Sequence, residues 1–364
     1  IPYEMIETPD ALAALAERLK AETAVAVDTE FVWDRTYYAR LGLVQIGTAG
    51  GECFLVDAVT IPDLSPLAGL LENPGLVKIL HDAPQDLMIL RKTTGGAAKN
   101  VFDTRLAAGF AGLASTLSLA NLLMEALGVH LEKAHTRADW VKRPLKAEEL
   151  EYAADDVLHL PALAEWLRER AQAAGVAAWL DEEMKKYDEP GFHDEASPEE
   201  AFRRIRLYPP LPPRQLAVLR ELAAWREREA QRADRPRKWI LEDRELTAMA
   251  AALPKTVENL GGLVTNPKVI QRVGRDLLAA VEKGLVRPES ECPEAPPPPR
   301  RDKPFKQAVD DVLKQIQDKA ARIPIDPQLV CSRGELAQRM QANGGETALD
   351  PANWTGWRAE FMGR

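Results

Sequence analysis

The chain has 364 residues, which is too long for one compact core and predicts two or three domains. Hydrophobic residues make up 46% and charged residues 28%, as in globular proteins, and no apolar run reaches the length of a membrane span. The net charge of −9 argues against a uniformly basic nucleic-acid binder, and three scattered cysteines indicate neither a disulfide framework nor a zinc site. No secretory signal segment is recognisable, so a reducing cytoplasm is the expected location.

The N-terminal block, residues 1–180, mixes helical and strand patterns. It opens with a helical pattern from Pro9 to Lys20, and further helical patterns lie around and after the last strands. Short β-rich runs bounded by glycine or polar turns are predicted as strands, namely AVAVDTEF, LGLVQIG, ECFLVDA, LVKIL and VFDT. This order predicts an α/β sheet covered by helices.

The rest of the chain is predicted to form two helical domains and two linkers. Residues 181–205 form an acidic linker, expected to be a solvated connector or an exposed helix end. Residues 206–287 form the first helical domain, and residues 288–304 a proline-rich linker with too few apolar residues to pack. Residues 305–364 form the second helical domain.

Both helical domains show the apolar spacing of amphipathic helices. The positions that mark these faces are Leu216, Leu219, Leu222 and Trp225 in the first domain, and Val309, Val312, Leu313 and Ile316 in the second. Ser332, with Glu335 three residues later, predicts a capping box at the start of a further helix. Residues 202–240 carry eleven Arg or Lys against four acids, so this segment can bind phosphates within an acidic protein.

Two acids, Asp28 and Glu30, lie in the apolar run AVAVDTEF. Residues two apart in a strand point to the same face, so two carboxylates would repel each other on a buried strand. A nearby arginine is one way to offset that cost. Divalent cations are the other, because Mg²⁺ and Mn²⁺ prefer carboxylate oxygens.

A second pair of residues, Tyr152 and Asp156, lies in EYAADDV. A spacing of four places both on one face of a helix, one turn apart. Asp155 lies about 100° around the helix and is expected to face another target. A surface tyrosine above a solvated aspartate is the alternative interpretation of this motif when it is taken alone.

A further acid, Asp86, follows the predicted strand LVKIL, in a helix that begins near Pro84. An acid in the first turn of a helix is explained by the helix dipole alone. Asp82 competes with it as an N-cap residue.

These motifs occur in an order that resembles the DEDD superfamily of 3′–5′ exonucleases, in the branch with tyrosine in its last motif. Further short motifs are LVQIG, FDT, and RADW followed by RPL, which are similar to those of the ribonuclease D family. The segment from Leu219 to Pro254 resembles an HRDC domain, and the C-terminal tail resembles a second one. The resemblance implies a ribonuclease H-like exonuclease domain followed by two all-α HRDC-like domains.

The resemblance also implies the chemistry. Four carboxylates, from Asp28, Glu30, Asp86 and Asp156, would hold two divalent metal ions, Mg²⁺ or Mn²⁺, with Asp86 acting mainly through a water. Asp86 is favoured over Asp82 because the family places its acid at the fifth position from the histidine. Tyr152 would orient the attacking water, because its pKa near ~10 makes it a poor base at neutral pH. The substrate would be RNA, such as tRNA precursors with a single-stranded 3′ end.

Several other residues receive a structural interpretation. They are the histidines His81, His130 and His135, the loop anchor Asp103, the core residue Phe31, and the helix-bundle tryptophans Trp225, Trp239, Trp354 and Trp357. For Lys133, Arg137 and Trp140, contact with nucleic acid and a packing role both stay open. Two functional alternatives also stay open: a DNA exonuclease with the same site, and a catalytically inactive nucleic-acid-binding scaffold.

Overall fold

The chain forms two compact units. The computed structural model describes residues 2–131, 138–189, 191–207, 209–294, 300–343 and 348–363. The first unit comprises Ile1–Val32, Leu41–Asp194 and Pro299–Arg364, and the second comprises Trp33–Arg40 and Glu195–Pro298. The second unit therefore includes a short loop from the N-terminal block. No helix among the described residues is both long and apolar enough to cross a membrane.

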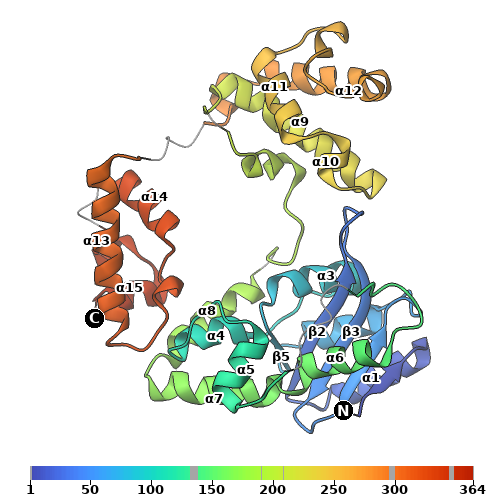
Figure 1. Ribbon diagram of the computed structural model, residues 1–364, viewed down its shortest axis with the longest axis vertical. Coiled ribbons are helices and arrows are strands. Elements are labelled where there is room, and N and C mark those ends of the chain that lie inside the picture. Colours follow the sequence, from blue (N-terminus) through green and yellow to red (C-terminus); the bar gives the residue numbers. More distant parts are fainter. Residues whose placement is uncertain are drawn as a thin grey trace. The chain divides into compact units, whose positions relative to one another are not determined.

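A mixed six-stranded sheet forms the centre of the first unit (Figure 1). Its strands are β1 (Glu4–Ile6), β2 (Ala24–Val32), β3 (Arg40–Thr48), β4 (Cys53–Asp57), β5 (Val77–Leu80) and β6 (Val101–Asp103). They lie in the order β1-β4-β3-β2-β5-β6. β1 pairs parallel to β4, β2 to β5 and β5 to β6, whereas β3 and β4 are antiparallel. The predicted strands β2 to β6 are confirmed, whereas β1 was not predicted.

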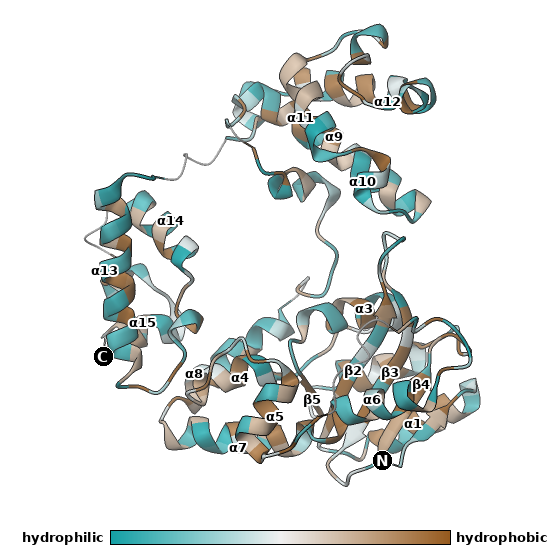
Figure 2. Ribbon diagram, viewed as in Figure 1, coloured by the Kyte–Doolittle hydropathy of each residue, from teal (hydrophilic) through white to brown (hydrophobic). Residues whose placement is uncertain are grey.

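Helices surround this sheet. They are α1 (Pro9–Leu19), α2 (Ala68–Glu72), α3 (Pro84–Thr94), α4 (Thr104–Phe110), α5 (Leu119–Leu127), α6 (Ala147–Leu158), α7 (Leu160–Ala173) and α8 (Ala177–Met184). α6 packs on β2 and β4, and α7 packs on β2 and β5. Figure 2 shows why: the helices present apolar stripes and polar outer faces, as amphipathic helices do. The α/β sheet predicted for this block is confirmed.

The C-terminal helices belong to the first unit. They are α13 (Lys303–Ala320), α14 (Arg333–Asn343) and α15 (Gly356–Gly363). Trp357 of α15 is buried and stacks on Trp179 of α8, with ring centroids 5.8 Å apart. Its indole Nε1 donates a 2.8 Å hydrogen bond to Glu183. The predicted capping box at Ser332 and Glu335 is confirmed by two hydrogen bonds between these residues.

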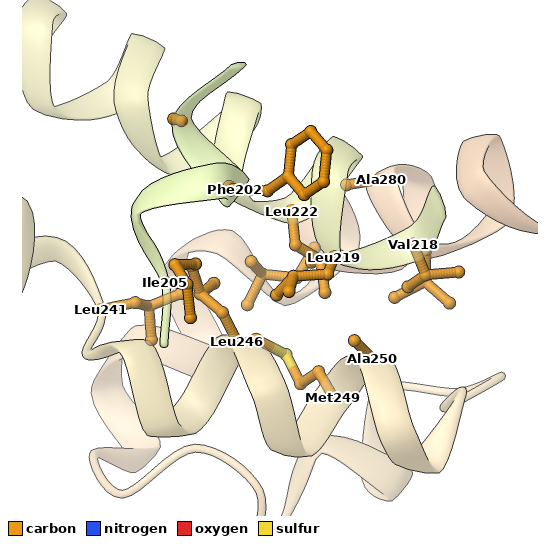
Figure 3. Close-up of a cluster of buried hydrophobic side chains, with 14 of the residues drawn as sticks. Phe202, Ile205, Val218, Leu219, Leu222, Leu241, Leu246, Met249, Ala250 and Ala280 are labelled. Atoms are coloured by element: carbon orange, nitrogen blue, oxygen red, sulfur yellow. The ribbon is translucent and has the colours of Figure 1, made fainter. Parts of the chain in front are cut away.

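The second unit is a helical bundle. Its helices are α9 (Pro213–Ala233), α10 (Arg237–Ile240), α11 (Asp243–Ala252) and α12 (Pro267–Leu285). Figure 3 shows its core, in which Leu219 and Leu222 of α9 meet Leu246 and Met249 of α11. Phe202 comes from a short 3-10 helix that precedes the bundle and closes one side of this core. The apolar face predicted for α9 is confirmed.

The acidic segment differs from the predicted solvated connector. Residues 181–188 continue α8 and form a 3-10 helix, and Tyr187 is only 1% exposed. The Tyr187 hydroxyl donates a 2.6 Å hydrogen bond to Asp103, and the buried His193 lies close to the carbonyl oxygen of Tyr187. The aromatic residues of this part of the acidic segment pack within the first unit despite the charge of their neighbours, because each one buries a large apolar area.

Candidate active site

Three carboxylates converge on one face of the sheet. Asp28 and Glu30 point to the same side of β2, and Asp156 reaches them from α6. One carboxylate oxygen from each lies within 4.8 Å of the others, close enough for all three to bind one metal ion. Strand alternation places Asp28 and Glu30 on one face of β2, and the packing of α6 on β2 brings Asp156 to that face.

Glycines on β3 allow α6 to approach the sheet. A Cβ atom at Gly47 would lie 2.8 Å from the carbonyl oxygen of Val157, the residue that follows Asp156. At Gly42 it would lie 2.3 Å from the carbonyl oxygen of Trp140. Larger residues at these positions would push away both segments that face the site. The LVQIG motif thus positions the site without contributing a polar group to the three-carboxylate cluster.

Burial and mutual repulsion make these acids hard to ionise. Desolvation, followed by the charges of Asp156 and Asp86, raises the pKa of Glu30 from 4.5 to about 8. Desolvation raises the pKa of Asp156 to about 7 and that of Asp86 to about 6. The pKa of Asp28 is raised well above 3.8 by burial and by the charges of the other three acids. These shifts mark a site short of positive charge.

Neutral donors, rather than cations, hold the acids. The Trp140 indole donates a hydrogen bond to Glu30, and the Tyr152 hydroxyl donates one to Asp156. The rings of Trp140 and Tyr152 lie together, with centroids 6.2 Å apart. Within the described part of the chain, no lysine or arginine forms an ion pair with Asp28, Glu30 or Asp156. The arginine that could have neutralised the DxE motif is therefore not found among these residues.

Asp86 lies beside the cluster, in the first turn of α3. It is buried, and it accepts a hydrogen bond from the hydroxyl of Thr29, the residue between Asp28 and Glu30. It is not one of the three acids whose oxygens lie within 4.8 Å of one another. Its competitor Asp82 instead forms an ion pair with Arg105, with its side chain 56% exposed.

The other residues singled out in the sequence divide into clear groups. His81 lies close to Thr104 and to a backbone carbonyl, and Asp103 caps α4, so their structural interpretation is confirmed. Trp140 is buried, which favours packing over contact with nucleic acid. The question of nucleic-acid contact for Lys133 and Arg137, and the role of His135, lie outside the described residues.

The tryptophans of the helical regions do not all behave as predicted. Trp354 and Trp357 are buried, and Trp225 is partly buried against the bundle core. Trp239 is 53% exposed, so its assignment to the bundle core was wrong. It lies in the four-residue helix α10, which is too short to show an apolar periodicity.

Comparison with known proteins agrees with this geometry. A 3′-5′ exonuclease family model matches residues 3–172, and an HRDC domain model matches residues 215–281. Ribonuclease D of Desulfotalea psychrophila is 36% identical over 98% of this chain and 96% of its own length. The crystal structure of Escherichia coli RNase D covers 100% of this chain and 97% of its own, at 32% identity and a TM-score of 0.85.

A more distant match is the catalytic core of RRP6 from Trypanosoma brucei. It covers 78% of this chain and 80% of its own, at 26% identity and a TM-score of 0.57. The matches to ribonuclease D extend over nearly the whole chain, so they cover both units and are sufficient to assign the family. They also confirm the predicted fold class, an exonuclease domain followed by helical regions that include an HRDC domain. The chain belongs to the ribonuclease D family.

Proposed function

We propose that the protein removes nucleoside 5′-monophosphates from the 3′ end of RNA, by a mechanism that uses two divalent metal ions. The observation that carries this proposal is the cluster of Asp28, Glu30 and Asp156, with Asp86 beside it. Membership of the ribonuclease D family supports the reaction class and RNA as the substrate. The E. coli relative is described as an exoribonuclease involved in structured RNA processing.

The acids fit divalent cations by their chemistry. Four carboxyl groups with raised pKa values share a buried region, and oxygen donors of this kind suit Mg²⁺ or Mn²⁺. Asp28, Glu30 and Asp156 would hold one ion, Asp28 would also reach a second, and Asp86 would contribute through a water. Such ions supply Lewis acidity and lower the pKa of a bound water.

The protein's own groups then set the geometry of hydrolysis. The water oxygen attacks the phosphorus of the last phosphodiester, and the bond to the 3′ oxygen of the preceding nucleotide breaks. The Tyr152 hydroxyl orients that water, since burial and the nearby acids raise its pKa well above 10 and prevent it from acting as a base. The products are a nucleoside 5′-monophosphate and an RNA shortened by one nucleotide.

The finer substrate assignment is a precursor tRNA or another structured RNA with a single-stranded 3′ end. Exonucleolytic cleavage starts from one strand end, so a paired 3′ end would have to open before cleavage. Residues 202–240 carry eleven Arg or Lys against four acids, and several of these arginines form ion pairs with acids. The remaining positive charge of this segment supports the binding of a longer RNA body by phosphate contacts that carry no sequence information.

A hydrolysis assay tests this function. A 5′-labelled single-stranded oligoribonucleotide is incubated with the full-length protein in Mg²⁺, in Mn²⁺ or in EDTA, beside a DNA of the same sequence. We expect stepwise shortening of RNA from its 3′ end with either metal and none in EDTA. Asp28→Asn serves as the inactive control.

The same assay separates the alternatives. Preferential shortening of the DNA would make the protein a DNA exonuclease. RNA binding without hydrolysis under any metal would make it an inactive scaffold. Release of internal fragments instead of mononucleotides would refute exonucleolytic cleavage altogether.

A further inference from the structure

The second unit contains an open cavity of about 860 Å³ that is separate from the carboxylate cluster. Its walls come from the loop 33–37, the 3-10 helix Pro198–Arg204, α9, and the segment 236–244 that includes α10. The volume lies within the range of about 300–1,000 Å³ that is typical of small-ligand sites. All of these walls belong to the same compact unit.

Two exposed tryptophans line this cavity. Trp239 is 53% exposed and Trp33 is 42% exposed. The Trp33 ring is held in place by a 2.8 Å hydrogen bond from its Nε1 to the carbonyl oxygen of Tyr37. Exposed tryptophans carry a hydrophobic cost, and two of them on one cavity indicate a ligand with flat, apolar faces.

The charged residues of the cavity have two different roles. Arg226 donates to Asp243 at 2.8 Å, and Arg237 forms an ion pair with the buried Glu227 at 2.5 Å. These pairs brace α9 against the segment 236–244, and most of their charge is cancelled.

Two further cations line the cavity, Arg204 and Lys238, and the first of them lies near enough to Glu227 for its charge to lower the pKa of that acid. Among the described residues, the structure shows no hydrogen bond or ion pair for the exposed side chains of Arg204 and Lys238. Both are therefore available to a ligand that carries negative charge. A ligand with flat faces and a negative charge on every unit is a nucleic-acid strand.

We propose that this cavity, which we call the tryptophan pocket, binds a nucleotide of the RNA strand at a distance from the cleaved end. Trp239 and Trp33 stack on bases, and Arg204 and Lys238 bind the adjoining phosphates. The inference rests on the proposed function for the identity of the strand. Trp33 lies only three residues after Glu30 in the sequence, so the segment that carries the proposed metal ligands continues directly into this pocket. Stacking accepts every base, which suits an enzyme that shortens RNA without regard to sequence.

Binding measurements on the full-length protein test the proposal. The probe is a fluorescent oligoadenylate of about 16 nucleotides, and EDTA prevents cleavage during the titration. Trp239→Ala should weaken binding by about 5- to 100-fold, whereas Trp239→Phe should retain most of the affinity because a ring remains. Val286→Ala, which removes another exposed apolar side chain of the same unit, is the matched control and should change nothing.

The salt dependence of RNA binding tests the role of Arg204 and Lys238. Replacing Arg204 and Lys238 together by alanine should lower the slope of log affinity against log salt by about 1 to 1.5. Arg235→Ala is the matched control, because Arg235 is exposed in the same unit and does not line the pocket. Equal salt slopes in the double variant and the wild type would refute a phosphate role for this pair.

Hydrolysis of a diadenylate separates this inference from the proposed function. A diadenylate has no nucleotides beyond the two that flank the cleaved bond, so Trp239→Ala should leave its kcat and KM unchanged while raising the KM for the longer RNA. If the wild type shortens RNA but Trp239→Ala binds the oligoadenylate with native affinity, the tryptophan pocket does not bind RNA. If the wild type hydrolyses no RNA but Trp239→Ala binds the oligoadenylate more weakly than the wild type, the proposed function fails and the pocket stands as a binding site.

Discussion

Glu30→Gln should stabilise the metal-free protein while it removes activity. The pKa of Glu30 rises from 4.5 to about 8, and at about 1.4 kcal/mol for each pKa unit this corresponds to about 5 kcal/mol against the ionised form. Glutamine has the same shape, keeps an oxygen that can accept the Trp140 hydrogen bond, and carries no charge. The figure of about 5 kcal/mol is an upper limit, because the folded site relaxes around a charge.

The pH dependence follows from the sign of this shift. Between the unfolded pKa of 4.5 and the folded pKa of about 8, the native state binds more protons than the unfolded state. The wild type in EDTA should therefore lose stability as the pH rises through this window and level off above it. The advantage of Glu30→Gln should be absent near pH 4.5 and largest from pH 8 upwards.

Thermal unfolding in EDTA at pH 5, 7 and 8 measures this effect. At about 2–4 °C for each kcal/mol, the upper limit of about 5 kcal/mol corresponds to about 10–20 °C, and we expect the variant's Tm to exceed that of the wild type by part of this amount, about 5 °C or more, at pH 8. Glu151→Gln is the control, because Glu151 is an exposed acid on α6 and its replacement should leave the Tm unchanged at every pH. With Mg²⁺ the difference in Tm between the variant and the wild type should become smaller or change sign, because only the wild type has all the carboxylates that bind the ion. A variant Tm equal to or below that of the wild type at pH 8 in EDTA would refute the idea that repulsion between acids strains this site.

Three further substitutions test the site and its support. Asp28→Asn should abolish RNA hydrolysis and leave the far-UV circular dichroism unchanged; near-native turnover would contradict the proposed metal site. Tyr152→Phe should lower kcat more than it weakens RNA binding, whereas Asp155→Asn should keep near-native kcat, and the reverse order would show that the wrong face of α6 was chosen. Trp357→Ala should lower the free energy of unfolding of the first unit by about 3–5 kcal/mol in urea denaturation, and a loss below about 1 kcal/mol would mean that α15 is not tightly packed.

The sequence patterns predicted which acidic residues share a face of one strand or one helix. Asp28 and Glu30 share a face because strands alternate, and Tyr152 and Asp156 share one because a helix turns every 3.6 residues. The resemblance to the DEDD exonucleases, whose motifs occur in this order, implied which elements must meet. The structure adds the distances between these acids: carboxylate oxygens of Asp28, Glu30 and Asp156 lie within 4.8 Å of one another.

Contacts between distant segments escaped prediction for a physical reason. The hydrogen bond from Trp140 to Glu30 joins residues that are far apart in sequence, and no periodicity relates them. The packing of Trp357 on Trp179 is of the same kind. Gly47 offered a weak signal, since a glycine inside a strand often marks a close approach of another backbone, here that of α6.

The acids of this site are held by groups that leave their charge available. Trp140 donates to Glu30, Thr29 to Asp86, and Tyr152 to Asp156, and each donor is neutral. A lysine or arginine in these places would lower the cost of burial, but it would also compete with a metal ion for the same oxygens. Neutral donors fix the orientation of each carboxylate and leave the excess negative charge in place. Repulsion between the carboxylates therefore destabilises the metal-free site, and a bound divalent cation removes that repulsion. The same residues thus explain the raised pKa values, the expected gain in stability on neutralising one acid, and the affinity for metal on which the proposed hydrolysis depends.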